Sequence, residues 1–151
     1  MRTSNEKSLG SLIHLSTLSQ YIIPLGNYIF PLLLWTTRKE KSDFIDHNGK
    51  QALNFQLSIL LYSLIAIIIS IPTFIFWLIN TIEKLEMNNQ VITMREVITT
   101  QNITGMVLLG LIALILIAFL KLSEFFLIIY ASVKSANGEQ YNYPLTIKFI
   151  K

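Results

Sequence analysis

The chain has 151 residues, of which 52% are hydrophobic and 14% charged, and its formal net charge is +3. Soluble domains usually carry roughly 25% charged residues, so this composition argues against a water-soluble globular protein. No basic stripe is interleaved with aromatic residues, which argues against a nucleic-acid partner, and the lack of cysteine excludes a thiol nucleophile or a cysteine metal site.

Three long stretches contain no Asp, Glu, Lys or Arg: residues 8–37, 51–82 and 97–120. About 20 apolar residues are enough to cross a bilayer as a helix, and so short a chain has little else with which to bury such segments. The sequence therefore predicts an all-α integral membrane bundle in a single membrane domain, residues 1–151. Its three transmembrane helices are expected at about residues 12–35, 51–79 and 105–133.

The first of these helices is predicted to be broken near Pro24–Asn27. Proline removes a backbone hydrogen bond, and Gly26 adds conformational freedom beside it. Pro31 follows Asn27 by about one turn. Residues 12–35 reach about 36 Å, which is enough for one crossing and too short for two. Polar side chains such as His14 and Asn27 recur at helical spacing, so this face is expected to contact other helices.

A charged cytoplasmic connection is predicted at residues 37–50. The second helix then begins at about Gln51, and its polar residues Gln51, Asn54 and Ser58 are three or four positions apart, which places them on one side. Together with Gln56, the side chains of Asn54 and Ser58 are expected to hydrogen-bond neighbouring helices near the cytoplasmic end. A polar connection, with a surface helix as one possibility, is predicted at residues 80–102.

The third helix contains Lys121 and Glu124, although ionisable groups inside a membrane span are costly and often functional. Because they are three positions apart, they can form a structural pair on one face, and this interpretation is favoured over a substrate or proton path. His14 is similarly interpreted as a hydrogen-bonded packing residue. A polar tail follows at residues 134–151.

The distribution of cations predicts the orientation. With three crossings, seven Lys and Arg residues flank the first connection and the tail, against four on the other side. This count predicts a multi-pass membrane protein with the first connection and the carboxyl terminus in the cytoplasm. If residues 12–35 instead re-enter as a hairpin, the amino terminus is also cytoplasmic and the count becomes nine against two. The charge count favours this alternative, whereas the length of the segment favours a crossing.

No enzyme signature is present, and the sequence predicts neither catalytic residues nor a cofactor site. His47 lies near Asp43 and Asp46 in the first connection, but metal binding there would need a further ligand, so no metal site is predicted. The protein is therefore expected not to be an enzyme.

Several motifs together resemble a known family, and they are carried by residues 14–18, 23–27, 46–58 and 138–144. The chain resembles small bacterial membrane proteins of unknown function that are related to the channel subunit of the chloroplast inner-envelope import translocon (TIC-like proteins). The resemblance implies a helical bundle in the bacterial cytoplasmic membrane, with the helix that contains Asn54 starting on the cytoplasmic side. It implies no settled activity.

Three functions are consistent with these features. The favoured hypothesis is a non-enzymatic scaffold or assembly factor whose partners are the lipid bilayer and other membrane proteins or further copies of itself. The alternative is a pore or transporter component, with a path lined by the broken first helix and by Lys121 and Glu124. A third option is a protein with a role in lipid or envelope-stress functions that binds anionic headgroups through the basic first connection.

Overall fold

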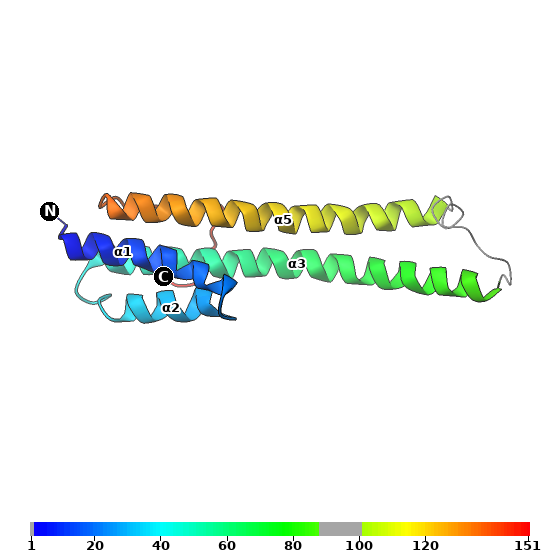
Figure 1. Ribbon diagram of the computed structural model, residues 1–151, viewed down its shortest axis with the longest axis horizontal. Helices are drawn as coiled ribbons and strands as arrows, with labels where there is room; N and C mark the ends of the chain where they lie inside the picture. The colour runs from blue at the N-terminus through cyan, green and yellow to red at the C-terminus, as the bar shows by residue number, and fades with distance from the viewer. Residues whose placement is uncertain (1, 88–100) are drawn as a thin grey trace. The chain divides into compact units, whose positions relative to one another are not determined.

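The computed structural model describes residues 2–87 and 101–151, and every regular element in these ranges is a helix (Figure 1). The all-α prediction is therefore confirmed for the described residues. The elements are α1 (Ser4–Ser16), the 3₁₀ turn η1 (Thr17–Tyr21), α2 (Gly26–Thr36), α3 (Asp43–Met87) and α5 (Gln101–Ala136). Two segments are long and apolar enough to cross a membrane, Asp43–Phe76 in α3 and Leu108–Ala136 in α5. A third crossing is not confirmed.

The chain forms two compact units, and each is described by itself. The first unit joins Met1–Leu61 to Lys121–Lys151, so it contains α1, η1, α2, the start of α3, the end of α5 and the polar tail. The second unit, Tyr62–Leu120, consists of the remaining parts of α3 and α5.

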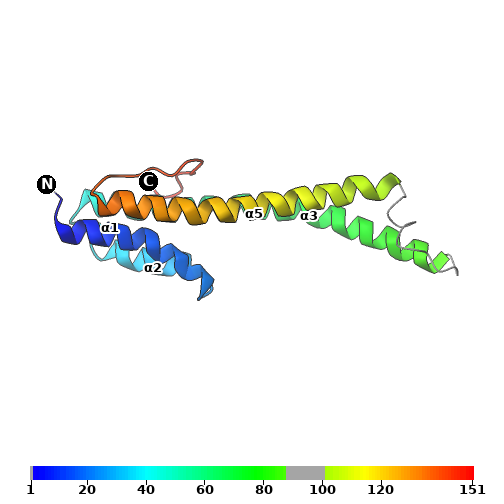
Figure 2. The ribbon, with the colours of Figure 1, turned by 45° about the horizontal axis from the view of Figure 1, so that its top comes forward.

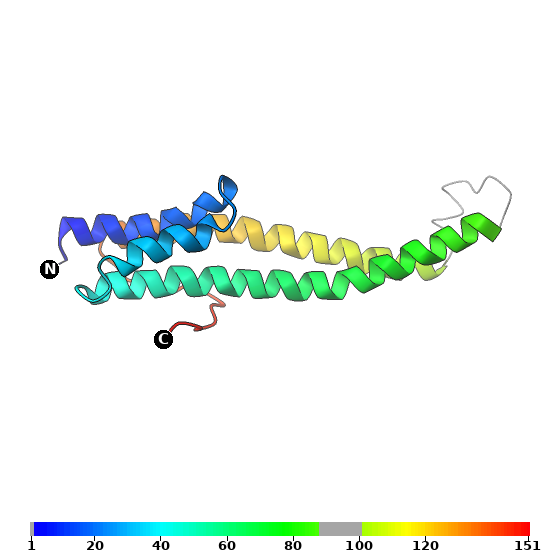
Figure 3. The same cartoon turned by 90° about the horizontal axis from the view of Figure 1, so that it is seen from below.

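In the first unit, α1 and α2 form a helical hairpin, and they lie side by side and run in opposite directions (Figure 3). The chain turns at residues 22–25, where Leu25 has a φ of 61°. A Cβ on Gly26 would lie 3.0 Å from the backbone of Ser19, so glycine permits the close approach of the two arms. The break therefore lies close to the predicted position near Pro24–Asn27, at residues 22–25, because α2 already begins at Gly26. The chain reverses there, however, so the structure does not support one broken crossing over residues 12–35.

The helices extend beyond the predicted bounds. A capping box between Thr3 and Glu6 starts α1 at Ser4, well before residue 12. Helix α3 starts at Asp43, so residues 43–50 are helical and do not belong to the connection. Two aspartates in its first turn favour this start, because carboxylates stabilise a helix amino terminus. The predicted connection at residues 80–102 is also shorter, because α3 continues to Met87 and α5 begins at Gln101; the surface helix proposed there lies outside the described residues.

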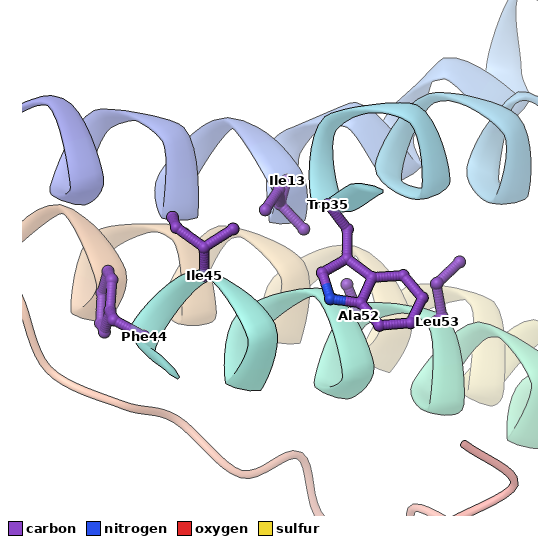
Figure 4. Close-up of a cluster of buried hydrophobic side chains, with 6 residues drawn as sticks. All are labelled: Ile13, Trp35, Phe44, Ile45, Ala52 and Leu53. Carbon is purple, nitrogen blue, oxygen red and sulfur yellow. The ribbon is translucent and has the colours of Figure 1, made fainter. Parts of the chain in front are cut away.

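A small apolar core joins α1, α2 and α3 in the first unit, and Figure 4 shows the indole of Trp35 lying across α3. Its buried members are Ile13, Trp35, Phe44, Ile45, Ala52 and Leu53. Gly49 makes this packing possible, because a Cβ at that position would overlap the Trp35 ring. The indole Nε1 donates a hydrogen bond to Asp46 Oδ1 at 3.0 Å, which fixes the ring on α3.

The second unit is mostly apolar on its outside. Ile68 is 66% exposed on α3 and Ile115 is 68% exposed on α5. The Ser70 hydroxyl donates a hydrogen bond to the carbonyl of Ala66 on its own helix at 2.6 Å, which satisfies the hydroxyl in an apolar surrounding. These features suit helices surrounded by lipid or by other apolar helices.

Candidate functional site

The polar side chains of the first unit converge on three sets of contacts, and His14 is at the centre of the first. His14 is fully buried on α1; its Nε2 lies 2.8 Å from Asn48 Oδ1, and its Nδ1 lies 3.0 Å from Tyr143 Oη. Because Asn48 Nδ2 donates to the carbonyl of Phe44, Asn48 Oδ1 must accept from His14. His14 is therefore the neutral Nε2–H tautomer, and Tyr143 donates to its Nδ1. Burial lowers the pKa of His14 to about 4, although the Asn48 hydrogen bond raises it.

The second set binds the extended tail, residues 137–151, which runs back along the unit after α5 ends (Figure 2). Asn54 makes two hydrogen bonds with the backbone of Ile150: its Nδ2 donates to the carbonyl at 2.9 Å, and its Oδ1 accepts from the N–H at 2.8 Å. Ser58 Oγ accepts from the N–H of Ile147 at 2.9 Å. Gln51 Oε1 accepts from the N–H of Tyr143 at 3.2 Å. The polar stripe of α3 therefore binds the backbone of the tail and not another helix.

Tyr143 connects these two sets. Its ring stacks on Phe55 of α3 with centroids 4.1 Å apart, while its hydroxyl reaches His14 of α1. Burial raises the pKa of Tyr143 well above its usual range, so the phenol stays protonated and keeps its role as donor. One tail residue thus joins helices that are far apart in sequence.

Gln56 lies on a different face of α3 from Asn54 and Ser58. Its Oε1 accepts from Asn27 Nδ2 of the hairpin at 2.7 Å, and its backbone carbonyl accepts from Tyr28 Oη at 3.3 Å. Pro31 is fully buried one turn after Asn27 in α2, whereas Pro24 is exposed at the hairpin turn. The candidate interface residues Asn54, Gln56 and Ser58 are therefore divided between the tail and the hairpin.

The third set surrounds Glu124, which is fully buried on α5. Its Oε2 accepts from Lys121 Nζ at 2.8 Å, and its Oε1 accepts from Gln20 Nε2 in η1 at 2.8 Å. The lysine side chain is 45% exposed, so only the carboxylate is enclosed. The pairing links the hairpin turn to α5 and uses both carboxylate oxygens.

Sequence reasoning did not select Gln20, Asn48, Gln51 or Tyr143 as site residues, although each takes part in these contacts. Helical spacing did indicate Gln51, since it shares a stripe with Asn54. The tail partner gave no comparable signal, because 129 positions separate His14 from Tyr143.

These sets are arranged for holding the fold together. Nearly all of their buried polar atoms have a partner. Among the described residues, the buried side-chain atoms without a hydrogen-bond partner are Gln56 Nε2, Ser63 Oγ, Ser135 Oγ and Thr146 Oγ1. Within residues 2–87 and 101–151, no three His, Asp or Glu side chains lie together as metal ligands would. These contacts hold the helices and the tail together, because their hydrogen-bonding groups face each other.

Comparison with known proteins identifies the family. The family model of the magnetosome magnetite crystal formation proteins (MamF/MmsF) matches residues 5–150, which is almost the whole chain. No curated protein and no solved structure matches the chain. The resemblance to bacterial relatives of the chloroplast translocon channel is therefore wrong, because the motifs that suggested it lie within the MamF/MmsF match. The chain belongs to the MamF/MmsF family of magnetosome magnetite crystal formation proteins.

Proposed function

We propose that this chain is a non-enzymatic membrane scaffold that acts through self-association or through other membrane proteins. One observation carries the proposal: polar groups are paired inside the first unit, while the outside of the candidate spans is apolar. In an 18-residue stretch of each candidate span, only 6% (α3) and 11% (α5) is buried. Almost their whole length must therefore be covered by lipid or by protein.

The family description supports a role in assembly. It associates the family with the formation of magnetite crystals in magnetosomes. We extend this to the chain as an organising role within a membrane, carried out by its helices and not by a catalytic centre.

We also propose that α1 and α2 re-enter the membrane from the cytoplasmic side and that α3 and α5 cross it. The hairpin turn is apolar outside, since Ile22 is 85% exposed and Leu25 is 65% exposed. This topology places both described ends of the chain and the connection before α3 on one side. Nine Lys and Arg residues then face the cytoplasm against two on the other side, in agreement with the positive-inside rule.

Photo-crosslinking tests the scaffold proposal. Ile67 and Ile69 are both exposed on α3, at 41% and 59%, and their side chains point in nearly opposite directions because each helical residue turns the direction by about 100°. We expect a photoreactive residue at one of them to give a discrete protein adduct in the native membrane, while the other gives lipid adducts. Lipid adducts at both positions, repeated at Ile115, would contradict the proposal.

Flux measurements separate this function from the pore alternative. Purified protein in liposomes is expected to conduct neither ions nor small solutes, because both oxygens of Glu124 are already bonded. Flux that disappears in Glu124→Gln at unchanged protein abundance would favour the pore instead.

A further inference from the structure

A pocket of about 600 Å³ opens between the start of α1 and the connection from α2 to α3, entirely within the first unit. Its lining is polar on one part and apolar on the other. The lining includes Ser8, Leu9, Leu12, Arg38, Lys41 and Ile45. A volume of this size is typical of sites that bind organic ligands.

The two cations of this pocket differ from the neighbouring ones. Lys39 lies over the ring of Trp35 at 5.2 Å, and Lys50 pairs with Asp46 at 2.6 Å. In the described part of the chain, the side chains of Arg38 and Lys41 make neither an ion pair nor a hydrogen bond. The pocket therefore contains the two cations of the connection that remain available to an anion.

The acidic residue beside the pocket is already engaged. Glu6 Oε1 accepts from Ser42 Oγ at 2.6 Å, and Glu6 Oε2 accepts from the backbone N–H and the hydroxyl of Thr3. Both carboxylate oxygens thus serve to cap α1 and to hold the start of α3. With Glu6 counted, the charged groups that line the pocket still sum to a positive charge.

The apolar part of the pocket continues onto the outer surface of the hairpin. Leu12 lines the pocket and is 52% exposed, and Leu15, one turn further along α1, is 37% exposed. A ligand with a charged head and a long apolar chain would satisfy both parts. Inorganic phosphate would leave the leucines without a partner.

We propose that this pocket binds one anionic phospholipid, with the phosphate between Arg38 and Lys41 and an acyl chain along Leu9 and Leu12. Arg38 offers a planar fork of donors to the phosphate oxygens, and Lys41 adds a point charge. The Ser8 hydroxyl can donate a further hydrogen bond. This inference rests on the membrane location but not on self-association, so crosslinking can fail while lipid binding holds.

Native mass spectrometry of the full chain in detergent tests the proposal, with phosphatidylglycerol and phosphatidylcholine as probes. We expect one phosphatidylglycerol to be retained in preference to phosphatidylcholine. The double variant Arg38→Gln/Lys41→Gln should bind phosphatidylglycerol about 30-fold more weakly, as expected when two basic contacts are lost. The matched control Lys148→Gln/Lys151→Gln removes the same charge from exposed tail positions and should bind within about twofold of the unmodified chain.

A second variant tests the pocket without changing charge. Ser8→Trp places an indole from an exposed position into the pocket and should also abolish retention. Retention that survives Ser8→Trp, or that falls equally in both double variants, would overturn the pocket as the site. Competition by inorganic phosphate or glycerol phosphate as effective as that by the lipid would overturn the assignment to a lipid.

Discussion

Acidification should weaken the first unit through His14. A histidine whose pKa falls on folding stabilises the fold at pH values above its unfolded pKa, and this stabilisation is lost as the pH falls toward the folded pKa. For His14 the window runs from 6.5 down to about 4. Since one pKa unit corresponds to about 1.4 kcal/mol, the full loss is about 3 kcal/mol, and about 2 kcal/mol is lost by about pH 5.

The structure explains why the proton is costly. The imidazole is fully buried, and its Nδ1 already accepts from Tyr143. A proton on Nδ1 would remove that acceptor and place a positive charge in an apolar surrounding. The tyrosine hydroxyl could rotate to accept, so desolvation of the charge accounts for most of the penalty.

The assay is denaturant unfolding in detergent micelles, followed by tryptophan fluorescence at a series of pH values. The unmodified chain should lose about 2 kcal/mol between about pH 7 and about pH 5. His14→Gln should be less stable at neutral pH, because Asn48 and Tyr143 lose a partner, but its stability should vary less with pH. His47→Gln, which changes the other histidine of the chain, is the matched control and should retain most of the pH dependence. An equal loss in the unmodified chain and in His14→Gln would refute this reasoning.

Three further predictions concern single contacts. Asn54→Leu removes both hydrogen bonds between Asn54 and the tail, each of which stabilises the attachment by about 1 kcal/mol. It should therefore increase the rate of carboxypeptidase trimming by about 30-fold. An unchanged rate would show that the tail is held by other contacts. Gly49→Ala should destabilise the protein by about 1–3 kcal/mol, because the added Cβ overlaps the buried indole of Trp35. The control Gly110→Ala places its Cβ in open space and should be neutral or stabilising by up to about 1 kcal/mol. Similar unfolding curves for the two variants would contradict this. Lys121→Met leaves the buried Glu124 carboxylate without its counter-charge, although Gln20 still donates to it, and should cost about 2–3 kcal/mol. Adding Glu124→Gln should restore most of this stability, so purely additive effects in the double-mutant cycle would be the contrary result.

Local sequence patterns predict some features of this fold and leave others undetermined. Pro24 and Gly26 determine the position of the break in the first apolar segment, and that position was predictable because their effects are local. The direction of the chain after the break was not, since a broken crossing and a hairpin have the same hydropathy. What decides it is the contact of Gly26 with Ser19 and the bond of Asn27 to Gln56, which depend on packing.

The polar stripe of α3 gives the same lesson for the site. Helical spacing placed Gln51, Asn54 and Ser58 together, and their side chains do share a task. The sequence suggested a neighbouring helix as partner, because polar groups in membranes usually pair between helices. The partner is instead the backbone of the tail. Ile150, which binds Asn54, lies 96 positions away from it in the sequence, and spacing alone cannot reveal such a contact.

The attachment of the tail has a consequence for the order in which this protein matures. Residues 141–150 follow all the helices in the chain, so during synthesis they leave the ribosome after every helix to which they bind. Until then, the side-chain amides of Gln51 and Asn54 on α3 lack the hydrogen-bond partners that the tail provides. His14 likewise lacks the Tyr143 hydroxyl. A nascent chain would therefore keep these polar groups unpaired until residues 141–150 have been synthesised. A chain that stops before residue 141 would leave them exposed to lipid, a defect that quality-control proteases of the membrane could recognise.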